Sequence, residues 1–320
     1  DNAEYGYGMY LAQDTMRKRL IREAEALVGD IEAPHEKEVL ENYLATLEDG
    51  EANLAATDTL IDVLSKSLDP RAQQLLHHKQ FLSKKSNWIL GGDGWAYDIG
   101  FGGLDHVMAS GADVNVLVFD TEVYSNTGGQ MSKSTPTGAV AQFAANGKEG
   151  TKKDLAYMMM TYGSVYVAQV ALGADFNQTL KAFREAESFP GPSLIIAYSP
   201  CINHGIRGGM INADIEMKKA VECGYWNLFR YDPRRKAEGK NPFQMDSKAP
   251  TGDYQAFLKN EVRYSALMRT YPERASRLFD RAEVNAIGRH ERLLQWEALS
   301  GKLVAAEAEE VEREAASRRA

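Results

Sequence analysis

Two short stretches of this sequence place acidic and hydroxyl side chains directly after apolar runs. In residues 87–103, NWILGGDGWAYDIGFGG, Asp93 stands between Gly92 and Gly94 just after the apolar run. In residues 117–138, LVFDTEVYSNTGGQMSKSTPTG, another apolar run leads into Asp, Thr, Ser and Asn side chains and a glycine pair. Carboxylate, hydroxyl and carbonyl oxygens are the ligands that Mg²⁺ prefers. If the two runs form adjacent parallel strands, these groups could hold a metal ion and a diphosphate together.

Taken alone, the Gly-Asp-Gly element fits a tight strand-to-helix turn in which Asp93 caps the helix. Asn126, however, follows Asp93 at the spacing that separates Gly-Asp-Gly from an Asn in the signature of thiamine diphosphate enzymes. The glycines let the backbone approach a diphosphate closely, and a helix that begins near Trp95 would direct its first amides at the phosphates. The paired motif therefore predicts thiamine diphosphate and Mg²⁺ as cofactors.

A nicotinamide dinucleotide is the competing cofactor. Its binding fingerprint is G-x-G-x-x-G between a strand and a helix, with an acidic residue at the end of the second strand. Asp120 could be that acid, but GGDGWAYDIGFGG does not present three glycines at the required spacing. Asp93 would also face the pyrophosphate with no metal between them. The sequence thus disfavours a dinucleotide site.

The elements that must position these residues follow from the apolar pattern. Short, β-branched apolar runs alternate with helical stretches, which is typical of parallel sheets covered by helices on both faces. Ligands of such sheets bind at the carboxyl ends of the strands. We therefore expect an α/β fold, a mainly parallel sheet flanked by helices as in thiamine diphosphate-binding folds. The expected strands are 88–90, 114–119, 165–170 and 194–198, and the expected helices include 95–110 and 176–187.

Helical arms are expected on either side of this core. Apolar residues recur at helical spacing through residues 8–82, and the chain after Asp232 is polar at first and then helical. We expect a helical N-terminal arm over residues 1–84, the cofactor-binding α/β core over 85–232, and a C-terminal helical extension over 233–320.

Composition limits the classes of partner. The net charge is −8, with no basic stripe of the kind that nucleic acid binding requires. The sequence contains no run of about 18 apolar residues, the length that a membrane span needs. Only two cysteines occur, too few for a disulfide framework, which fits a reducing cytoplasm. We expect a cytoplasmic protein with neither nucleic acid nor membrane as a partner.

Longer matches carry a resemblance to a known family. The stretches GGDGWAYDIGFGGLDHV, DTEVYSNTGGQMSKSTPTGA and YSPCINHGI resemble the C-terminal thiamine-binding domain of pyruvate:ferredoxin (flavodoxin) oxidoreductases. The opening DNAEYGYGM and the later NPFQMDSKAP resemble the same family, so the likeness covers nearly the whole chain except the final tail. Other thiamine enzymes share only the Gly-Asp-Gly and Asn elements, which makes the combination specific.

The resemblance implies roles for individual residues of the two motifs. It implies that Asp93, the Thr121 hydroxyl and the Val123 carbonyl bind Mg²⁺, and that Asn126 reaches the cofactor and substrate. The positions that it places beside the diphosphate are Gly92, Gly94, Trp95 and Ser125. The polar residues 132–135 are expected to rim the same pocket.

Cys201 alone would be read as a small buried apolar residue. The resemblance implies instead that it is one ligand of a [4Fe-4S] cluster near the thiamine. His204, three residues further on, is expected to cap or hydrogen-bond the same loop. Such clusters normally take four thiolates. Cys223 resembles a packing residue, so the other ligands, and part of the thiamine pocket, are expected on upstream segments. The chain thus looks like a C-terminal fragment or one piece of a split enzyme.

The activity implied by the resemblance is oxidative decarboxylation of pyruvate with coenzyme A to acetyl-CoA and CO₂. Electrons would leave singly through iron-sulfur clusters to ferredoxin or flavodoxin, in an enzyme completed by upstream domains and expected to be a homodimer. One alternative is a thiamine-dependent decarboxylase or carboligase without clusters. A third hypothesis treats the segment as a scaffold module without catalytic function.

Overall fold

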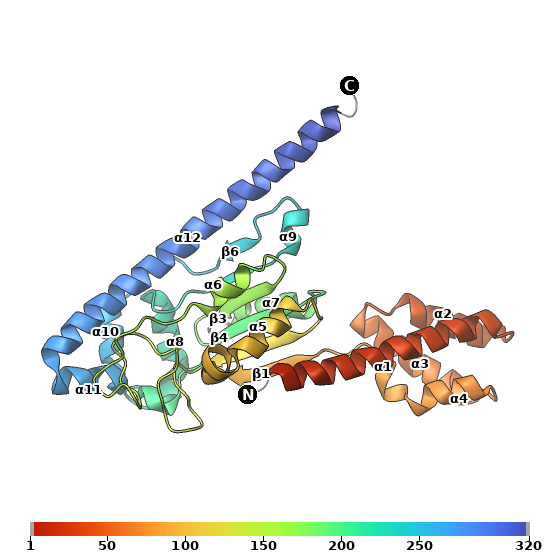
Figure 1. Cartoon of the computed structure of the whole chain (residues 1–320), viewed down its shortest axis with the longest axis horizontal. Helices are drawn as coiled ribbons and strands as arrows, with labels where there is room; N and C mark the ends of the chain where they lie inside the picture. The colour runs from red at the N-terminus through yellow and green to blue at the C-terminus, as the bar shows by residue number, and fades with distance from the viewer. Residues whose placement is uncertain (1–2, 318–320) are drawn as a thin grey trace. The chain divides into compact units, whose positions relative to one another are not determined.

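The computed structural model describes residues 3–317, with side chains through residue 306 (Figure 1). The chain divides into two compact units. One comprises residues 5–87, and the other comprises residues 88–317 together with residues 3 and 4. No helix within residues 3–317 combines the length and apolarity that crossing a membrane requires.

The unit formed by residues 5–87 is helical, as the periodicity predicts. Its helices are α1 (Ala3–Asp30), α2 (Pro34–Ala45), α3 (Gly50–Leu64) and α4 (Pro70–His77), followed by the 3₁₀ turn η1 (Lys79–Phe81). Leu20, Leu40, Tyr43 and Leu60 are fully buried in its core. Aspartates cap the N-termini of α3 and α4 by accepting hydrogen bonds from backbone amides of the first turn. Amphipathic helices therefore close a core of their own here.

The second unit is built on a six-stranded sheet of order β1-β2-β4-β3-β5-β6. The first four strands are parallel, and β5 and β6 are antiparallel to their neighbours. The predicted α/β fold with a mainly parallel sheet is confirmed, whereas the two last strands were not predicted. The strands are β1 (Trp88–Gly92), β2 (Asn115–Asp120), β3 (Tyr166–Val170), β4 (Ser193–Tyr198), β5 (Phe229–Tyr231) and β6 (Phe243–Met245).

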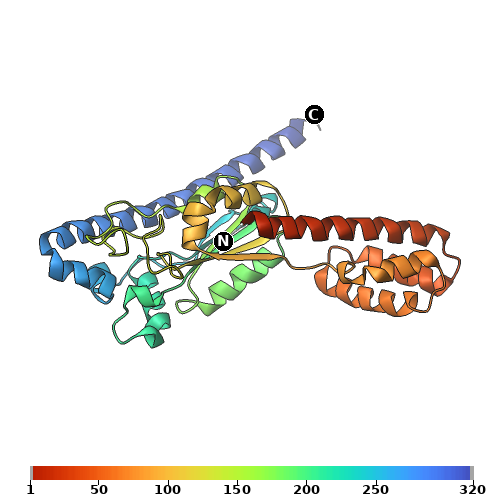
Figure 2. The ribbon, with the colours of Figure 1, turned by 60° about the horizontal axis from the view of Figure 1, so that its bottom comes forward.

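Helices cover both faces of this sheet. Helix α7 (Phe176–Glu187) lies on one face, where Ala182 and Ala186 pack in the same apolar cluster as Leu117 and Ile195. Helix α5 (Phe101–Ala109) lies on the other face (Figure 2). Because both faces are buried, the central strands are mostly apolar and do not alternate between apolar and polar residues.

The predicted helix over 95–110 is two elements. A π-helical turn, η2 (Gly94–Ile99), precedes α5. The indole of Trp95 lies against Gly91 and Gly100, where a Cβ would come within 2.3 Å and 2.1 Å of ring carbons. Only glycine leaves room for this ring. The π turn, a form often found at functional sites, follows immediately from Asp93.

The remaining elements surround the carboxyl ends of the parallel strands and the far edge of the sheet. A long loop over residues 121–154 follows β2 with only isolated bridges. Helix α12 covers the β6 edge, where the Met245 amide donates to Glu297 Oε1 at 2.9 Å. The remaining helices and 3₁₀ turns are α6 (Leu155–Met160), η3 (Ile202–His204), η4 (Met210–Asn212), α8 (Ala213–Glu222), α9 (Arg234–Ala237), α10 (Tyr254–Lys259), α11 (Val262–Thr270) and α12 (Pro272–Ser317).

The helical unit provides a test of its packing. Leu60→Ala removes a fully buried side chain of α3, and we expect it to lower the free energy of unfolding of this unit by about 2–5 kcal/mol. Leu54→Ala, on the same helix but 52% exposed, should cost less than about 1 kcal/mol. Urea-dependent proteolysis within residues 5–87 measures both, and equal losses would contradict the assigned core.

Candidate functional site

The two turns singled out in the sequence lie side by side. Strands β1 and β2 are adjacent and parallel, with Gly92 opposite Phe119, so both end at the same edge of the sheet. A pocket of about 400 Å³ opens there, lined by residues 90–95 from the first turn and by Phe119, Thr121 and residues 123–127 from the second. The predicted juxtaposition of Asp93 with the loop after β2 is therefore present in the structure.

Three oxygens of these turns lie at the spacing of metal ligands. Thr121 Oγ1 lies 2.8 Å from Asp93 Oδ1 and 2.9 Å from the Val123 carbonyl oxygen. Neighbouring ligands of an octahedral Mg²⁺ with bonds of 2.0–2.1 Å would be separated by about 2.9 Å. All three oxygens are of the hard type that this ion selects. The donor set and its spacing thus fit Mg²⁺.

Asp93 is fully buried, and its surroundings favour a nearby cation. Ser132 Oγ donates to its Oδ2 at 2.5 Å, and the Thr121 amide donates to its Oδ1 at 3.2 Å. Burial, together with the neighbouring charge of Asp120, raises the pKa of Asp93 to about 7. A carboxylate kept from water in this way is stabilised in its ionised form by a positive charge at its free edge.

The other predicted pocket residues also line this cavity. They are Gly92, Gly94, Trp95, Ser125 and Asn126. A Cβ at Gly92 would meet nothing within 4 Å, so the backbone here borders open space, whereas at Gly94 it would lie 2.5 Å from the ring of Tyr124. Ser125 Oγ donates to Thr121 Oγ1 at 2.6 Å. Asn126 is exposed at the pocket.

A buried ionic network lies beneath the Thr121–Val123 turn, and the sequence did not predict it. Lys152 Nζ lies 2.8 Å from Asp120 and 2.9 Å from Glu122. Arg263 lies 2.8 Å from Glu122 and 2.6 Å from Glu261. Each of these side chains is at most 10% exposed. Buried charges of both signs thus surround the residue between two of the candidate ligands.

Glu122 is held in an unusual backbone conformation by these contacts. Its φ is 59°, a region that costs a residue other than glycine about 1–3 kcal/mol. Burial works against its ionisation, but the charges of Lys152 and Arg263 prevail and bring the pKa of Glu122 well below its usual value. The ion pairs therefore fix a left-handed turn whose two flanking residues, Thr121 and Val123, present oxygens to the pocket.

His204 joins this turn to the loop after β4. Its Nε2 lies 2.9 Å from the Thr121 carbonyl oxygen, so His204 contacts the turn of residues 121–123, here called the metal loop because its oxygens are candidate Mg²⁺ ligands. Burial, with the charge of Arg263, lowers the pKa of His204 to about 3. The ring is therefore neutral, and a carbonyl partner requires that Nε2 carry the proton.

Cys201 lies at the carboxyl end of β4, beside β2 in the sheet. It is half-buried, and its Sγ accepts hydrogen bonds from the Asn203 amide and Asn203 Nδ2, both at 3.3 Å. Cys223 follows α8 and is buried. Among the described residues, no three His, Cys, Asp or Glu side chains gather to hold a metal by themselves. Cys201 can thus supply one thiolate but not a complete cluster site.

The residues 132–135 do not rim the pocket as expected. Ser132, Ser134 and Thr135 are buried under the two loops. Ser134 Oγ donates to Asp120 Oδ1 at 2.5 Å, and Thr135 Oγ1 donates to the Glu122 carbonyl at 2.6 Å. They support the metal loop from below, because hydroxyls satisfy buried carboxylates and carbonyls that would otherwise lack partners.

Comparison with protein families agrees with this geometry. Residues 76–197 match the family model described as "Thiamine pyrophosphate enzyme, C-terminal TPP binding domain". That span contains β1, β2 and the turns that carry Asp93 and Asn126. The segment that lines the pocket is therefore the segment that the thiamine pyrophosphate model recognises.

Close relatives extend the match beyond this domain. The pyruvate-flavodoxin oxidoreductase of Klebsiella pneumoniae is 50% identical over 304 residues, which cover 94% of this chain and 26% of the relative. That of Enterobacter agglomerans is 53% identical, with coverage of 89% and 25%. The pyruvate:ferredoxin oxidoreductase of Moorella thermoacetica is 52% identical, with coverage of 91% and 25%. Over about nine-tenths of its length the chain is thus similar to one segment of the pyruvate:ferredoxin (flavodoxin) oxidoreductases.

The resemblance predicted from the sequence is thus confirmed. The chain spans about a quarter of the length of these oxidoreductases. The resemblance of the opening and late segments agrees with matches that extend well beyond residues 76–197.

The two cysteines of this chain should differ in reactivity. Burial raises the pKa of the Cys223 thiol to about 12, so at pH 8 almost none of it is the reactive thiolate. Half-buried Cys201 should be alkylated by iodoacetamide in cluster-free protein, while Cys223 stays unmodified until urea is added. Peptide mass spectrometry measures both sites, and equal native alkylation would contradict the burial of Cys223.

Proposed function

We propose that this chain is the thiamine diphosphate- and Mg²⁺-binding part of an enzyme that oxidatively decarboxylates pyruvate with coenzyme A. Acetyl-CoA and CO₂ are the products, and electrons pass through [4Fe-4S] clusters to ferredoxin or flavodoxin. The observation that carries the proposal is the set of three oxygens, from Asp93, Thr121 and Val123, at Mg²⁺-ligand spacing on the pocket wall. Similarity to these oxidoreductases supports the substrate and the acceptor.

The chain's own residues would bind and orient the cofactor. Asp93, Thr121 and Val123 would hold Mg²⁺ beside the diphosphate. The open backbone at Gly92 would leave room for the phosphates, and the amides that begin at Gly94 would donate to them. When bound, thiamine diphosphate supplies the carbanion chemistry that cleaves a 2-oxo acid. At the diphosphate end of the cofactor, the protein therefore contributes positioning of the phosphates and charge.

Asn126 is the candidate catalytic residue of this segment. Its amide lies exposed at the pocket, after the metal-binding turn and near Ser125. An amide at such a place can orient the cofactor or donate to an oxyanion that develops on the substrate. Trp95, in contrast, is buried between glycines, and its place is to shape the turn that begins at Asp93.

Cys201 is the candidate ligand of the cluster through which electrons would leave the thiamine site. As one thiolate of a [4Fe-4S] cluster it would lie one strand away from the metal loop, and the other three thiolates would come from segments outside this chain. The two Asn203 N–H groups that point at Sγ are suited to stabilise a metal-bound thiolate.

The proposal extends to the organisation of the enzyme. Upstream domains complete the active site, two copies form a homodimer, and the enzyme works in the cytoplasm. Residues 1–84 serve as a helical arm, 85–232 as the cofactor-binding core and 233–320 as a helical extension. The helical unit of residues 5–87, with its own core, supports the first of these divisions.

Replacing Asp93 tests the metal site. In the complete enzyme, Asp93→Ala should weaken Mg²⁺-dependent thiamine diphosphate binding by more than about 100-fold, because even residues behind the ligands cost 10–100-fold. Asp105→Asn removes an acid on α5 that bonds Tyr162 and lies outside the pocket, and it should leave the affinity unchanged. Fluorescence titration with the cofactor measures both, and an unchanged affinity in Asp93→Ala would refute the assignment.

Replacing Cys201 tests the cluster ligand. Cys201→Ala should leave pyruvate decarboxylation partly intact but reduce ferredoxin reduction at least about ten-fold, because the cluster nearest the thiamine loses a thiolate. Cys223→Ala should change neither. Electron paramagnetic resonance of the reduced enzyme gives an independent readout, and a normal spectrum of that cluster in Cys201→Ala would remove this residue from the ligands.

A further inference from the structure

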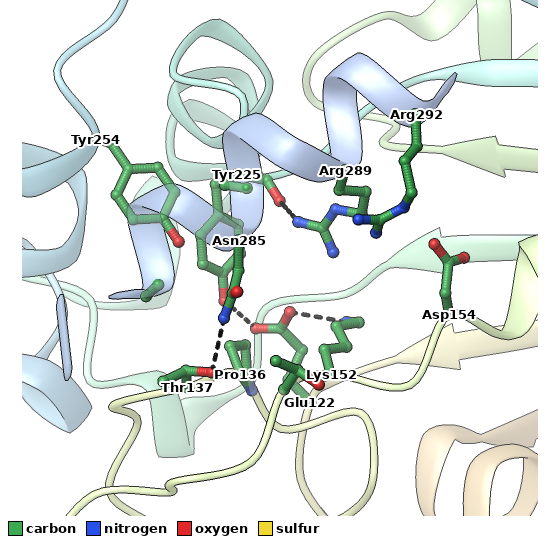
Figure 3. A pocket seen from close by; sticks show the side chains of 13 residues that line it. Glu122, Pro136, Thr137, Lys152, Asp154, Tyr225, Tyr254, Asn285, Arg289 and Arg292 are labelled. Carbon is green, nitrogen blue, oxygen red and sulfur yellow. Dashed lines mark hydrogen bonds and ion pairs between the residues drawn. The ribbon is translucent and has the colours of Figure 1, made fainter. Parts of the chain in front are cut away.

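A second pocket lies on the other side of the metal loop. It encloses about 190 Å³ between α12 and the segments around Thr137 and Lys152, and it shares no lining residue with the thiamine pocket (Figure 3). Its lining includes Glu122, whose chain neighbours Thr121 and Val123 line the thiamine pocket. The proposed cofactor site makes no use of this cavity, and three of its lining side chains, Lys152, Arg289 and Arg292, are cationic donors.

Two arginines of α12 face this pocket without acidic partners. Arg289 and Arg292 are three residues apart, on one side of the helix, where like charges repel each other. Within the described part of the chain, neither guanidinium forms an ion pair with a carboxylate. Arg289 donates one bond to the Tyr225 carbonyl at 2.7 Å, while its Nε is buried without a partner. Two positive charges therefore lie close together here without an ion-pair partner among the described residues.

A hydroxyl without a protein partner opens onto the same cavity. Tyr254 lines the pocket and is only 6% exposed as a residue, and its hydroxyl group forms no hydrogen bond with any residue that the structure describes. Figure 3 shows that hydroxyl turned toward the interior of the pocket, on the side of Asn285. The hydroxyl is therefore free to donate to a ligand that accepts hydrogen bonds.

The two acids of the pocket differ in their partners. Glu122 is bound by Lys152, Arg263 and the Tyr225 hydroxyl at 2.5–2.9 Å. The carboxylate of Asp154 accepts the Tyr157 amide at 3.1 Å at the start of α6 and forms no ion pair among the described residues, so it keeps its negative charge. Two unpaired guanidinium groups thus outnumber one unpaired carboxylate at the pocket, a balance that favours an anion.

We propose that this pocket binds a small tetrahedral oxyanion of the phosphate class, held by Arg289 and Arg292 with the Tyr254 hydroxyl as a third donor. Guanidinium forks match phosphate oxygens in pairs. The cavity is smaller than the roughly 300–1,000 Å³ that enclose drug-sized ligands, so it accommodates one phosphate group and not a whole nucleotide. The group can be inorganic phosphate or the terminal phosphate of a larger molecule whose remainder stays outside.

The test is phosphate binding by the complete enzyme saturated with thiamine diphosphate and Mg²⁺, so that the cofactor's own phosphate site is filled. Isothermal titration with inorganic phosphate should give one saturable site per chain. Asp93→Ala enzyme without cofactor should bind phosphate in the same pocket, which separates this site from the thiamine proposal. A folded wild-type enzyme that binds no phosphate would overturn the inference.

Variants decide which residues hold the anion. Arg289→Gln should weaken phosphate binding ten-fold or more, since hydrogen bonds to charged groups are among the stronger ones in proteins. Arg277→Gln is the matched control, because Arg277 lies on an exposed part of α12 and pairs with Glu149. Its phosphate affinity should stay within two-fold of wild type. Equal affinities in wild type and Arg289→Gln would overturn the site.

Tyr254→Phe supplies a variant that should fold normally, because the hydroxyl it removes opens onto the pocket and has no partner in the described chain. It should melt near the wild-type temperature yet bind phosphate several-fold more weakly. Unchanged phosphate affinity would remove Tyr254 from the site. Competition by coenzyme A, but not by its dephosphorylated form, would identify the source as the coenzyme's phosphate, and no competition would identify free phosphate.

Discussion

The structure depends on one close approach, that of the Asp93 carboxylate to the Thr121 hydroxyl across two adjacent strand ends. Each residue follows a strand of the same parallel pair, so the sheet register sets their separation before any ligand arrives. A carboxyl group without water would lose its charge in such a place. A divalent cation restores it, which is why the same burial that weakens the free acid prepares the site for a metal.

The turn after β2 is held from below by charges that are themselves buried. Burying Glu122, Arg263 and Glu261 carries a desolvation cost that ion pairing only partly offsets, so their value is not stability alone. They select one backbone shape, the left-handed Glu122 that separates Thr121 from Val123. A glycine would reach that shape more easily, but it would lose the pairs that exclude other conformations.

Much of this arrangement was predictable and some was not. The four parallel strands and α7 follow from apolar runs and helical spacing, which are local signals. Strands β5 and β6 have three residues each and carry Arg230 and Gln244, so no apolar run marks them. The pairing of Glu122 with Arg263 joins segments far apart in sequence and exists only after folding. The π turn at Gly94 depends on where the Trp95 ring packs, which spacing does not reveal.

The loops after β2 and β4 behave as one structural piece. His204, three residues after Cys201, donates to the Thr121 carbonyl, and the Ser199 amide donates to the Asp120 carbonyl at 3.0 Å. A neutral, fully buried imidazole keeps this link unchanged across the range in which histidines usually titrate. The fold itself therefore fixes the position of the loop that carries Cys201 relative to the metal loop. Any cluster bound through Cys201 would keep a fixed distance from a cofactor bound through Asp93, and electron transfer over such a gap depends on that constancy.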